Sequence, residues 1–173
     1  PVNPEFDVSL FGSALAPDLF ANPTFCDFTN GPCGTKTPGA ATATFELKNS
    51  LTKQTVGDAA QQYQRDRDPR EKLFEFGRCV VHFALDDQEA QFCTHLKGKA
   101  SWFLPFNQGW NDGAGNPPNP NGINTDFLWK RILTRSGLTN ILENYAQVIE
   151  TKDEKTGKKK ASQVWPRYHQ LDV

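Results

Sequence analysis

The middle of the chain reads as a strand, a helix and a second strand, and this order constrains the fold more than any other feature. The residues from Ala43 to Asn49 alternate between apolar and polar side chains, as in a β-strand that buries one face. The run 56–67 is rich in alanine, glutamine and arginine and is typical of a helix. The run 78–85 is apolar and short, which indicates a buried strand. The sequence therefore predicts an α/β fold in which this helix packs against the sheet.

The first of these strands carries a Glu-x-Lys pair. Because side chains alternate across a strand, Glu46 and Lys48 share one face, while Phe45 and Leu47 point into the core. A carboxylate can hold a hard divalent cation, and a neighbouring lysine can stabilise a developing negative charge, which together are the minimum for cleaving a phosphodiester. Alone, the pair also fits the solvated face of an edge strand. We expect the helix that follows to bring Gln62 close to both side chains.

The remainder of the chain is organised unevenly. The first forty residues are rich in turn-forming residues and contain one strand-like run, 6–11. A Gly/Asn/Pro-rich stretch, 109–122, cannot form a helix or a central strand, so we expect an ordered surface loop. Helices are predicted to start at Thr125, with a Thr or Asp cap, and at Ser136. The charged run 151–160 is expected to be a solvated hairpin with a possible contact to phosphate.

The cysteines and histidines are interpreted as structural residues. They are Cys26, Cys33, Cys79, Cys93, His82, His95 and His169. Cys26 and Cys33 flank an Asn-Gly turn, which leaves a zinc half-site or a disulfide conceivable. We instead expect four free, mostly buried thiols, because the other two cysteines lie in apolar strands. His82 and His95 are expected to be core or hydrogen-bonded residues and not metal ligands.

Composition sets broad limits on the protein. A chain of 173 residues with 37% hydrophobic and 23% charged residues is sufficient for one domain with a real core. The net charge of −1 provides no global basic field, so DNA binding would depend on local patches or on other parts of an assembly. No apolar run approaches a membrane span and no signal peptide opens the chain, so we expect a cytoplasmic protein. The absent initiator methionine suggests a fragment of a longer one.

Five segments of the chain, taken in order, resemble the N-terminal nuclease region of the restriction (motor) subunit of type I restriction-modification enzymes. They are 45–49, 65–71, 103–107, 113–120 and 166–170. The resemblance implies a PD-(D/E)xK nuclease-like core, which is a mixed sheet flanked by helices, followed by a C-terminal helical extension. It further implies an endonuclease-like domain over 1–150, and over 151–173 a linker and the start of a helicase-type motor domain. In that last segment Gln170 would contact the adenine of ATP.

The same resemblance implies a metal site. Mg²⁺ would be held by Asp7 and Glu46 with the carbonyl of Leu47, while Lys48 would orient the attacking water or stabilise the developing charge. Gln62 would position Lys48 or the phosphate.

The acid that accompanies Glu46 is normally at the start of the strand that pairs with the Glu-x-Lys strand. Asp7 is the first choice because the run 6–11 alternates like a strand and resembles the family's acidic strand. Asp27 is the rival, because it precedes an Asn-Gly turn like the one that follows this strand in relatives.

The resemblance predicts a metal-dependent endonuclease, a type I site-specific deoxyribonuclease that cuts double-stranded DNA after ATP-driven translocation. Its partners would be the specificity and methyltransferase subunits of the same complex. ATP would be bound by a motor domain that this chain lacks, because the chain contains no Gly-x-x-x-x-Gly-Lys-Ser/Thr sequence. The chain alone is expected to cleave little. The alternative is a catalytically silent docking or regulatory module that couples the motor to the other subunits.

Overall fold

The computed structural model describes residues 42–152 and 157–171. Its elements, in chain order, are β1 (Ala43–Leu47), η1 (Ser50–Thr52), α3 (Val56–Arg65), β2 (Val81–Leu85), β3 (Ala90–Cys93), β4 (Leu104–Pro105), η2 (Leu128–Ile132), α4 (Arg135–Asn144), β5 (Gln147–Lys152), β6 (Lys159–Val164) and η3 (Tyr168–Gln170). The predicted strand 6–11, Asp7, Asp27, Cys26 and Cys33 lie outside the described residues.

The central sheet is mixed, with the strand order β1-β2-β3-β4. β1 and β2 are parallel and are connected through α3, with Glu46 opposite Ala84 in the register. β2 pairs antiparallel with β3, and β3 antiparallel with β4. The predicted strand–helix–strand order and the mixed α/β class are therefore confirmed.

Helix α3 is fixed at its start by two acidic side chains. The Oδ2 atom of Asp58 accepts the backbone N–H of Thr55 at 2.7 Å, and the Thr55 hydroxyl caps the N–H of Asp58 in return. This hydrogen bonding lowers the pKa of Asp58. Asp86, which follows β2, accepts the N–H of Val56 at 2.6 Å. The start of α3 is thereby attached to the end of β2, which sets the position of the helix over the sheet.

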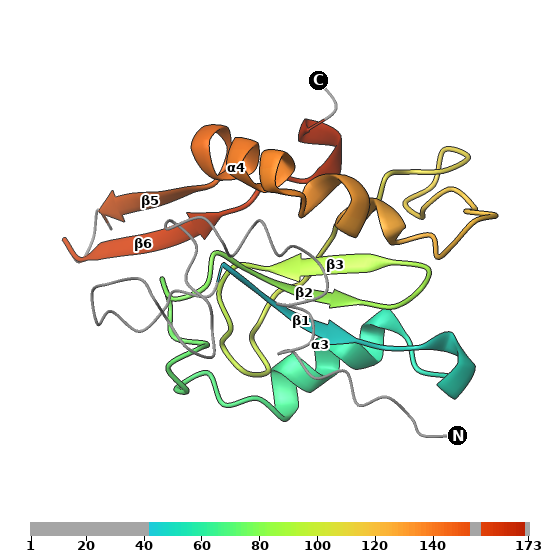
Figure 1. Ribbon diagram of the computed structural model, residues 1–173. Helices are drawn as coiled ribbons and strands as arrows, with labels where there is room; N and C mark the ends of the chain where they lie inside the picture. Colours follow the sequence, from blue (N-terminus) through green and yellow to red (C-terminus); the bar gives the residue numbers. More distant parts are fainter. Residues whose placement is uncertain (1–41, 153–156, 172–173) are drawn as a thin grey trace, which may run out of the picture.

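The sheet is covered on both faces (Figure 1). α3 lies on one face, and α4, η2 and the C-terminal segment lie on the other. The α3 side buries a small cluster that includes Ala59, Tyr63 and Phe74. The opposite side holds the larger core, in which the rings of Phe83 and Phe106 meet edge to face with centroids 5.5 Å apart.

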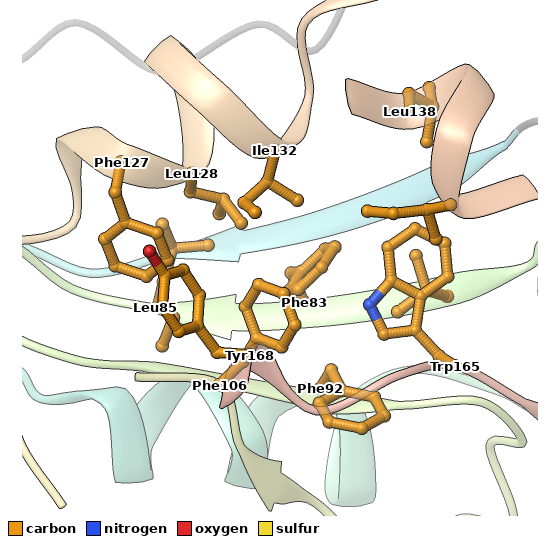
Figure 2. Packing of buried hydrophobic residues seen from close by; sticks show 13 residues of the cluster. Phe83, Leu85, Phe92, Phe106, Phe127, Leu128, Ile132, Leu138, Trp165 and Tyr168 are labelled. Carbon is orange, nitrogen blue, oxygen red and sulfur yellow. The ribbon is translucent and has the colours of Figure 1, made fainter. Parts of the chain in front are cut away.

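Residues near the end of the chain belong to that larger core. Trp165 and Tyr168 lie among the side chains of the sheet and of η2 in Figure 2. The Trp165 ring is 6.0 Å from that of Phe83, and the Tyr168 ring is 5.9 Å from that of Phe106. The segment 165–168 therefore packs on the same sheet, while the domain boundary predicted at residue 150 remains a prediction.

The helix predicted to start at Thr125 is present over 126–132, but its form and its cap differ from expectation. Most of this segment is η2, which is π-helical, and the N–H of Leu133 bonds to the carbonyl of Leu128 at 2.8 Å. The predicted Thr or Asp cap is wrong, because η2 has no side-chain cap. The hydroxyl of buried Thr125 donates to the carbonyl of Asp86 at 2.8 Å, and the Asp126 carboxylate accepts from Asn119 and pairs with Lys130. The next helix, α4, is capped by Thr134 and begins at Arg135, one residue before the predicted start.

A glycine allows η2 and α4 to meet closely. A Cβ atom at Gly137 would lie 2.2 Å from the carbonyl oxygen of Arg131 and 2.8 Å from that of Ile132. No real side chain accepts such distances, so the turn between the two segments requires glycine at this position.

The loop 109–122 and the hairpin are confirmed. Asn116 holds the loop in place by donating to the carbonyl of Gln88 at 2.8 Å and accepting the N–H of Gln108 at 2.9 Å. β5 and β6 form a separate antiparallel ribbon, so the C-terminal extension is helical only at α4 and η3. No helix in the described part of the chain is long and apolar enough to cross a membrane.

Candidate functional site

The Glu-x-Lys pair lies at the C-terminal end of β1, on the face covered by α3. Phe45 and Leu47 pack against the larger core on the opposite face, and the Phe45 ring stacks on Phe83 at 5.7 Å. The side chain of Glu46 is only 11% exposed, and Lys48 is half-buried. The predicted alternation is confirmed, and the pair is not the solvated face of an edge strand.

Gln62 comes from α3 and contacts the lysine. The Lys48 ammonium donates to the Gln62 side-chain oxygen, with 2.5 Å between Nζ and Oε1. At the backbone, the N–H of Lys48 bonds to the carbonyl of Leu85 at 2.9 Å, which continues the pairing of β1 with β2. The sequence correctly predicted that the helix would bring Gln62 to this pair.

Arg67 pairs with the carboxylate and was not predicted. Its Nε atom donates to Oε1 of Glu46 at 2.6 Å. This hydrogen bond raises the pKa of Arg67, so the guanidinium stays charged. Arg67 follows the C-cap of α3, where helical periodicity no longer applies. The one sequence signal for it is a positive charge just after a helix, which the helix dipole favours but which does not identify a partner.

A buried hydrogen-bonded group lies beneath the pair on the same face of the sheet. The Thr44 hydroxyl is 2.7 Å from the Tyr63 hydroxyl and 2.7 Å from Nδ1 of His82. Burial, with a smaller contribution from His95, lowers the pKa of His82 to about 4, so this ring is neutral at pH 7. Burial also raises the pKa of Tyr63. The group is a neutral support for β1, and His82 is the hydrogen-bonded core residue that was predicted.

The oxygen donors at the site are of the kind that hard divalent cations prefer. Glu46 supplies a carboxylate. Because the N–H of Lys48 points towards β2, the carbonyl of Leu47 points to the opposite edge of β1, where the described sheet has no further strand. Within 42–152 and 157–171, no group of three or more His, Cys, Asp and Glu side chains is arranged to hold a metal ion. A second carboxylate would have to come from elsewhere.

Asp86 directly follows Leu85, the β2 residue paired with Leu47, but its carboxylate has a structural role. Besides the N–H of Val56, it accepts those of Gln88 and Glu89, both at 2.8 Å. These bonds hold the β2–β3 turn and the start of α3, so Asp86 is not a candidate ligand.

The structure brings Glu46, Lys48 and Gln62 together and places Gln170 elsewhere. Gln170 is an exposed residue of η3, and its side-chain oxygen accepts the N–H of Arg167 at 2.8 Å. In Figure 1, this segment is on the α4 side of the sheet, opposite α3. The two buried cysteines within the described residues, Cys79 and Cys93, are free thiols.

One family of known proteins matches the part of the chain that contains this site. Residues 19–101 match the family described as the type I restriction enzyme R protein N terminus. This match covers 83 of the 173 residues. No curated protein and no solved structure matches the chain. The matched region contains β1, α3, β2 and β3 in full, and with them Glu46, Lys48 and Gln62. Asp27 lies inside the matched residues, and Asp7 precedes them.

Proposed function

We propose that this chain is the endonuclease domain of a type I restriction enzyme R subunit and hydrolyses DNA phosphodiesters with Mg²⁺. The observation that most supports this is the geometry of the Glu-x-Lys pair. A nearly buried carboxylate and a lysine held by a glutamine are grouped at the end of one strand, inside the region that matches the R protein family. The strand–helix–strand order around them is the one expected of a PD-(D/E)xK core.

Each residue has a defined part in this proposal. Glu46 and the carbonyl of Leu47 bind the metal, together with Asp7 or its rival Asp27. When bound, Mg²⁺ would polarise the scissile phosphate and lower the pKa of a bound water. Lys48 orients that water or stabilises the negative charge that develops on the phosphate, and Gln62 keeps the lysine in place. The water oxygen bonds to phosphorus as one P–O ester bond breaks, and the departing oxygen takes up a proton.

The remaining parts of the activity are assigned to other regions. Double-stranded DNA would be delivered to the site by an ATP-driven motor domain, and sequence recognition would belong to specificity and methyltransferase subunits. Gln170 is proposed to contact the adenine of ATP bound by that motor. We place the assembled enzyme in the cytoplasm, where its DNA substrate is found.

The test separates cleavage from the motor. In the assembled complex, Glu46→Gln and Lys48→Ala should abolish DNA cleavage and leave ATP hydrolysis and translocation near the wild-type rate. Lys53→Ala is a matched control, because Lys53 is an exposed lysine a few residues after the pair, and it should leave cleavage unchanged. Normal cleavage in both site variants would overturn the nuclease proposal.

A second candidate function is a silent docking or regulatory module. It is favoured by one observation, namely that Glu46 is not joined by two further acidic, cysteine or histidine side chains among the described residues. This alternative predicts that the full-length protein binds no Mn²⁺ through Glu46 and that Glu46→Gln has no effect on cleavage by the complex.

A further inference from the structure

The end of α3 supplies a partner for each member of the Glu-x-Lys pair. Gln62 contacts Lys48 through its side chain, while its carbonyl accepts the N–H of Asp66 at 2.9 Å and that of Arg67 at 3.2 Å. Arg67 in turn contacts Glu46. The backbone that positions Gln62 therefore also positions Arg67, so the two contacts form one structural unit.

The ion pair between Glu46 and Arg67 is asymmetric. Glu46 has an 11% exposed side chain and Arg67 a 42% exposed one. A nearly buried carboxylate is strongly destabilised if it has no cation beside it, whereas an exposed guanidinium keeps much of its hydration and can leave at a lower cost. Glu46 therefore requires a cation, but the cation need not be Arg67.

We propose that Arg67 neutralises Glu46 until a divalent cation arrives, and that its guanidinium then binds an oxygen of the scissile phosphate. This inference rests on the proposed function, because it takes Glu46 as the metal ligand. Arg67 and the metal ion are alternative counter-ions for the same carboxylate. When the metal ion displaces the Arg67 guanidinium from Glu46, a planar group with several N–H donors remains beside the site. The arrangement of these donors matches the oxygens of a phosphate.

The chain limits where the displaced guanidinium can go. Its backbone remains tied to the carbonyl of Gln62, so the side chain stays within reach of Lys48 and Glu46. Glu71 attracts it only through a weaker, longer-range interaction. A bound phosphodiester, whose charge the metal ion and Lys48 also attract, would offer the guanidinium a new anionic partner at the site.

The test uses the full-length protein and two measurements. Binding of Mn²⁺ is followed by electron paramagnetic resonance at pH 8 without nucleotide, and the binding lost in Glu46→Gln defines the site. Cleavage is followed in single turnovers by the assembled complex with ATP. The variants are Arg67→Ala and Arg67→Lys. Arg65→Ala is the matched control, because Arg65 is an exposed arginine in the last turn of α3.

The proposal predicts opposite changes in the two measurements. In Arg67→Ala, the site should bind Mn²⁺ about threefold to tenfold more tightly, because the competing counter-ion is gone and its exposure limits the gain. Cleavage should fall on the order of 100-fold, as for the loss of one donor to a transition-state oxygen. Arg67→Lys keeps the charge, so Mn²⁺ affinity should stay near wild type while cleavage falls by roughly tenfold. Arg65→Ala should change neither.

Both halves of this result are required. A parallel loss of metal binding and cleavage would indicate an ion pair that only maintains the structure, and it would overturn the proposal. Unchanged metal affinity or unchanged cleavage in Arg67→Ala would overturn it as well. If that variant does not fold, the separation of affinity from cleavage in Arg67→Lys decides. Full cleavage by Glu46→Gln would instead overturn the nuclease function itself, so the two failures are distinguishable.

Discussion

Each reactive side chain of the candidate site has one partner supplied by the end of α3. Lys48 is held by Gln62, and Glu46 by Arg67. The contact between Gln62 and Lys48 was predictable from the sequence. Strand alternation places Lys48 on one face of β1, and the helix that follows was expected to pack on that face. The contact between Arg67 and Glu46 was not predictable, because Arg67 lies past the C-cap, where its direction depends on how the chain leaves the helix.

Replacing Gln62 should weaken cleavage through the position of Lys48. Gln62→Ala removes the acceptor 2.5 Å from the ammonium, so the lysine loses its fixed geometry. We expect single-turnover cleavage to fall by about 10- to 100-fold, since misplacement by a small distance is costly in catalysis. Gln61→Ala, at the exposed neighbouring position of α3, should leave the rate unchanged. Equal rates in the two variants would contradict the role given to Gln62.

The second acid is predicted to be Asp7, and its rival Asp27 lies within the matched family region. Asp7→Asn should therefore abolish the Mn²⁺ binding that depends on Glu46, and Asp27→Asn should leave it intact. Titration of both variants in the full-length protein, followed by electron paramagnetic resonance, distinguishes them. Loss of binding in Asp27→Asn alone would mean that the wrong strand was chosen.

At the scale of elements, a neutral hydrogen-bonded group ties β1 to its neighbours. The Thr44 hydroxyl of β1 contacts Tyr63 of α3 and His82 of β2. The strands and α3 were predictable because their patterns are local, whereas the π-helical form of η2 and the absence of a Thr or Asp cap were not. The Thr125 hydroxyl bonds to the carbonyl of Asp86, 39 residues earlier in the chain, and no local pattern reports such a contact. Packing against the β2–β3 turn therefore decided the geometry of η2 over local capping preference.

The buried ring of His82 should make stability depend on pH. Its pKa is lowered from 6.5 to about 4 in the folded protein, so in acid the unfolded chain takes up a proton that the folded chain does not. Stability should be complete above pH 6.5 and decrease as the pH falls towards 4, by roughly 3 kcal/mol at most. His95, whose pKa burial also lowers, adds a change of the same sign.

Denaturant unfolding of the chain between pH 4 and pH 7.5 measures this dependence. In His82→Gln, whatever its absolute stability, the slope across this range should be clearly smaller than in the wild type. His169→Gln is the control, because His169 is exposed, and it should keep the wild-type slope. If the free energy of unfolding changed equally with pH in wild type and His82→Gln, the His82 ring would take up a proton as easily in the folded protein as in the unfolded chain, which would contradict the prediction.

At the scale of the whole molecule, the sheet separates two regions with different tasks. The α3 side carries the candidate site, and the α4 side holds the larger core (Figure 1), which includes Trp165 and Tyr168 (Figure 2). The sequence could not predict this second arrangement, because packing of a C-terminal segment against the sheet is a long-range contact. The candidate site and the C-terminal segment therefore lie on opposite faces of the sheet.

The isolated chain should bind duplex DNA weakly. Non-specific affinity comes from lysines and arginines that displace counterions from phosphates, and a chain with a net charge of −1 has little surplus. We expect affinity that falls steeply with salt, and little or no cleavage with Mg²⁺. Titration of a labelled duplex at low and moderate salt checks this. Tight sequence-specific binding by the chain alone would contradict the assignment of recognition to other subunits.

The central claim is that Glu46 is a metal ligand, and a crystal of the protein soaked in Mn²⁺ tests it most directly. The account predicts an anomalous peak within about 2.0–2.4 Å of the Glu46 carboxylate and the Leu47 carbonyl, the range of hard-cation sites. It also predicts that the Arg67 guanidinium will have left its 2.6 Å contact with Glu46. A fully soaked crystal with Arg67 still on Glu46, and with Mn²⁺ bound only elsewhere, would contradict the account.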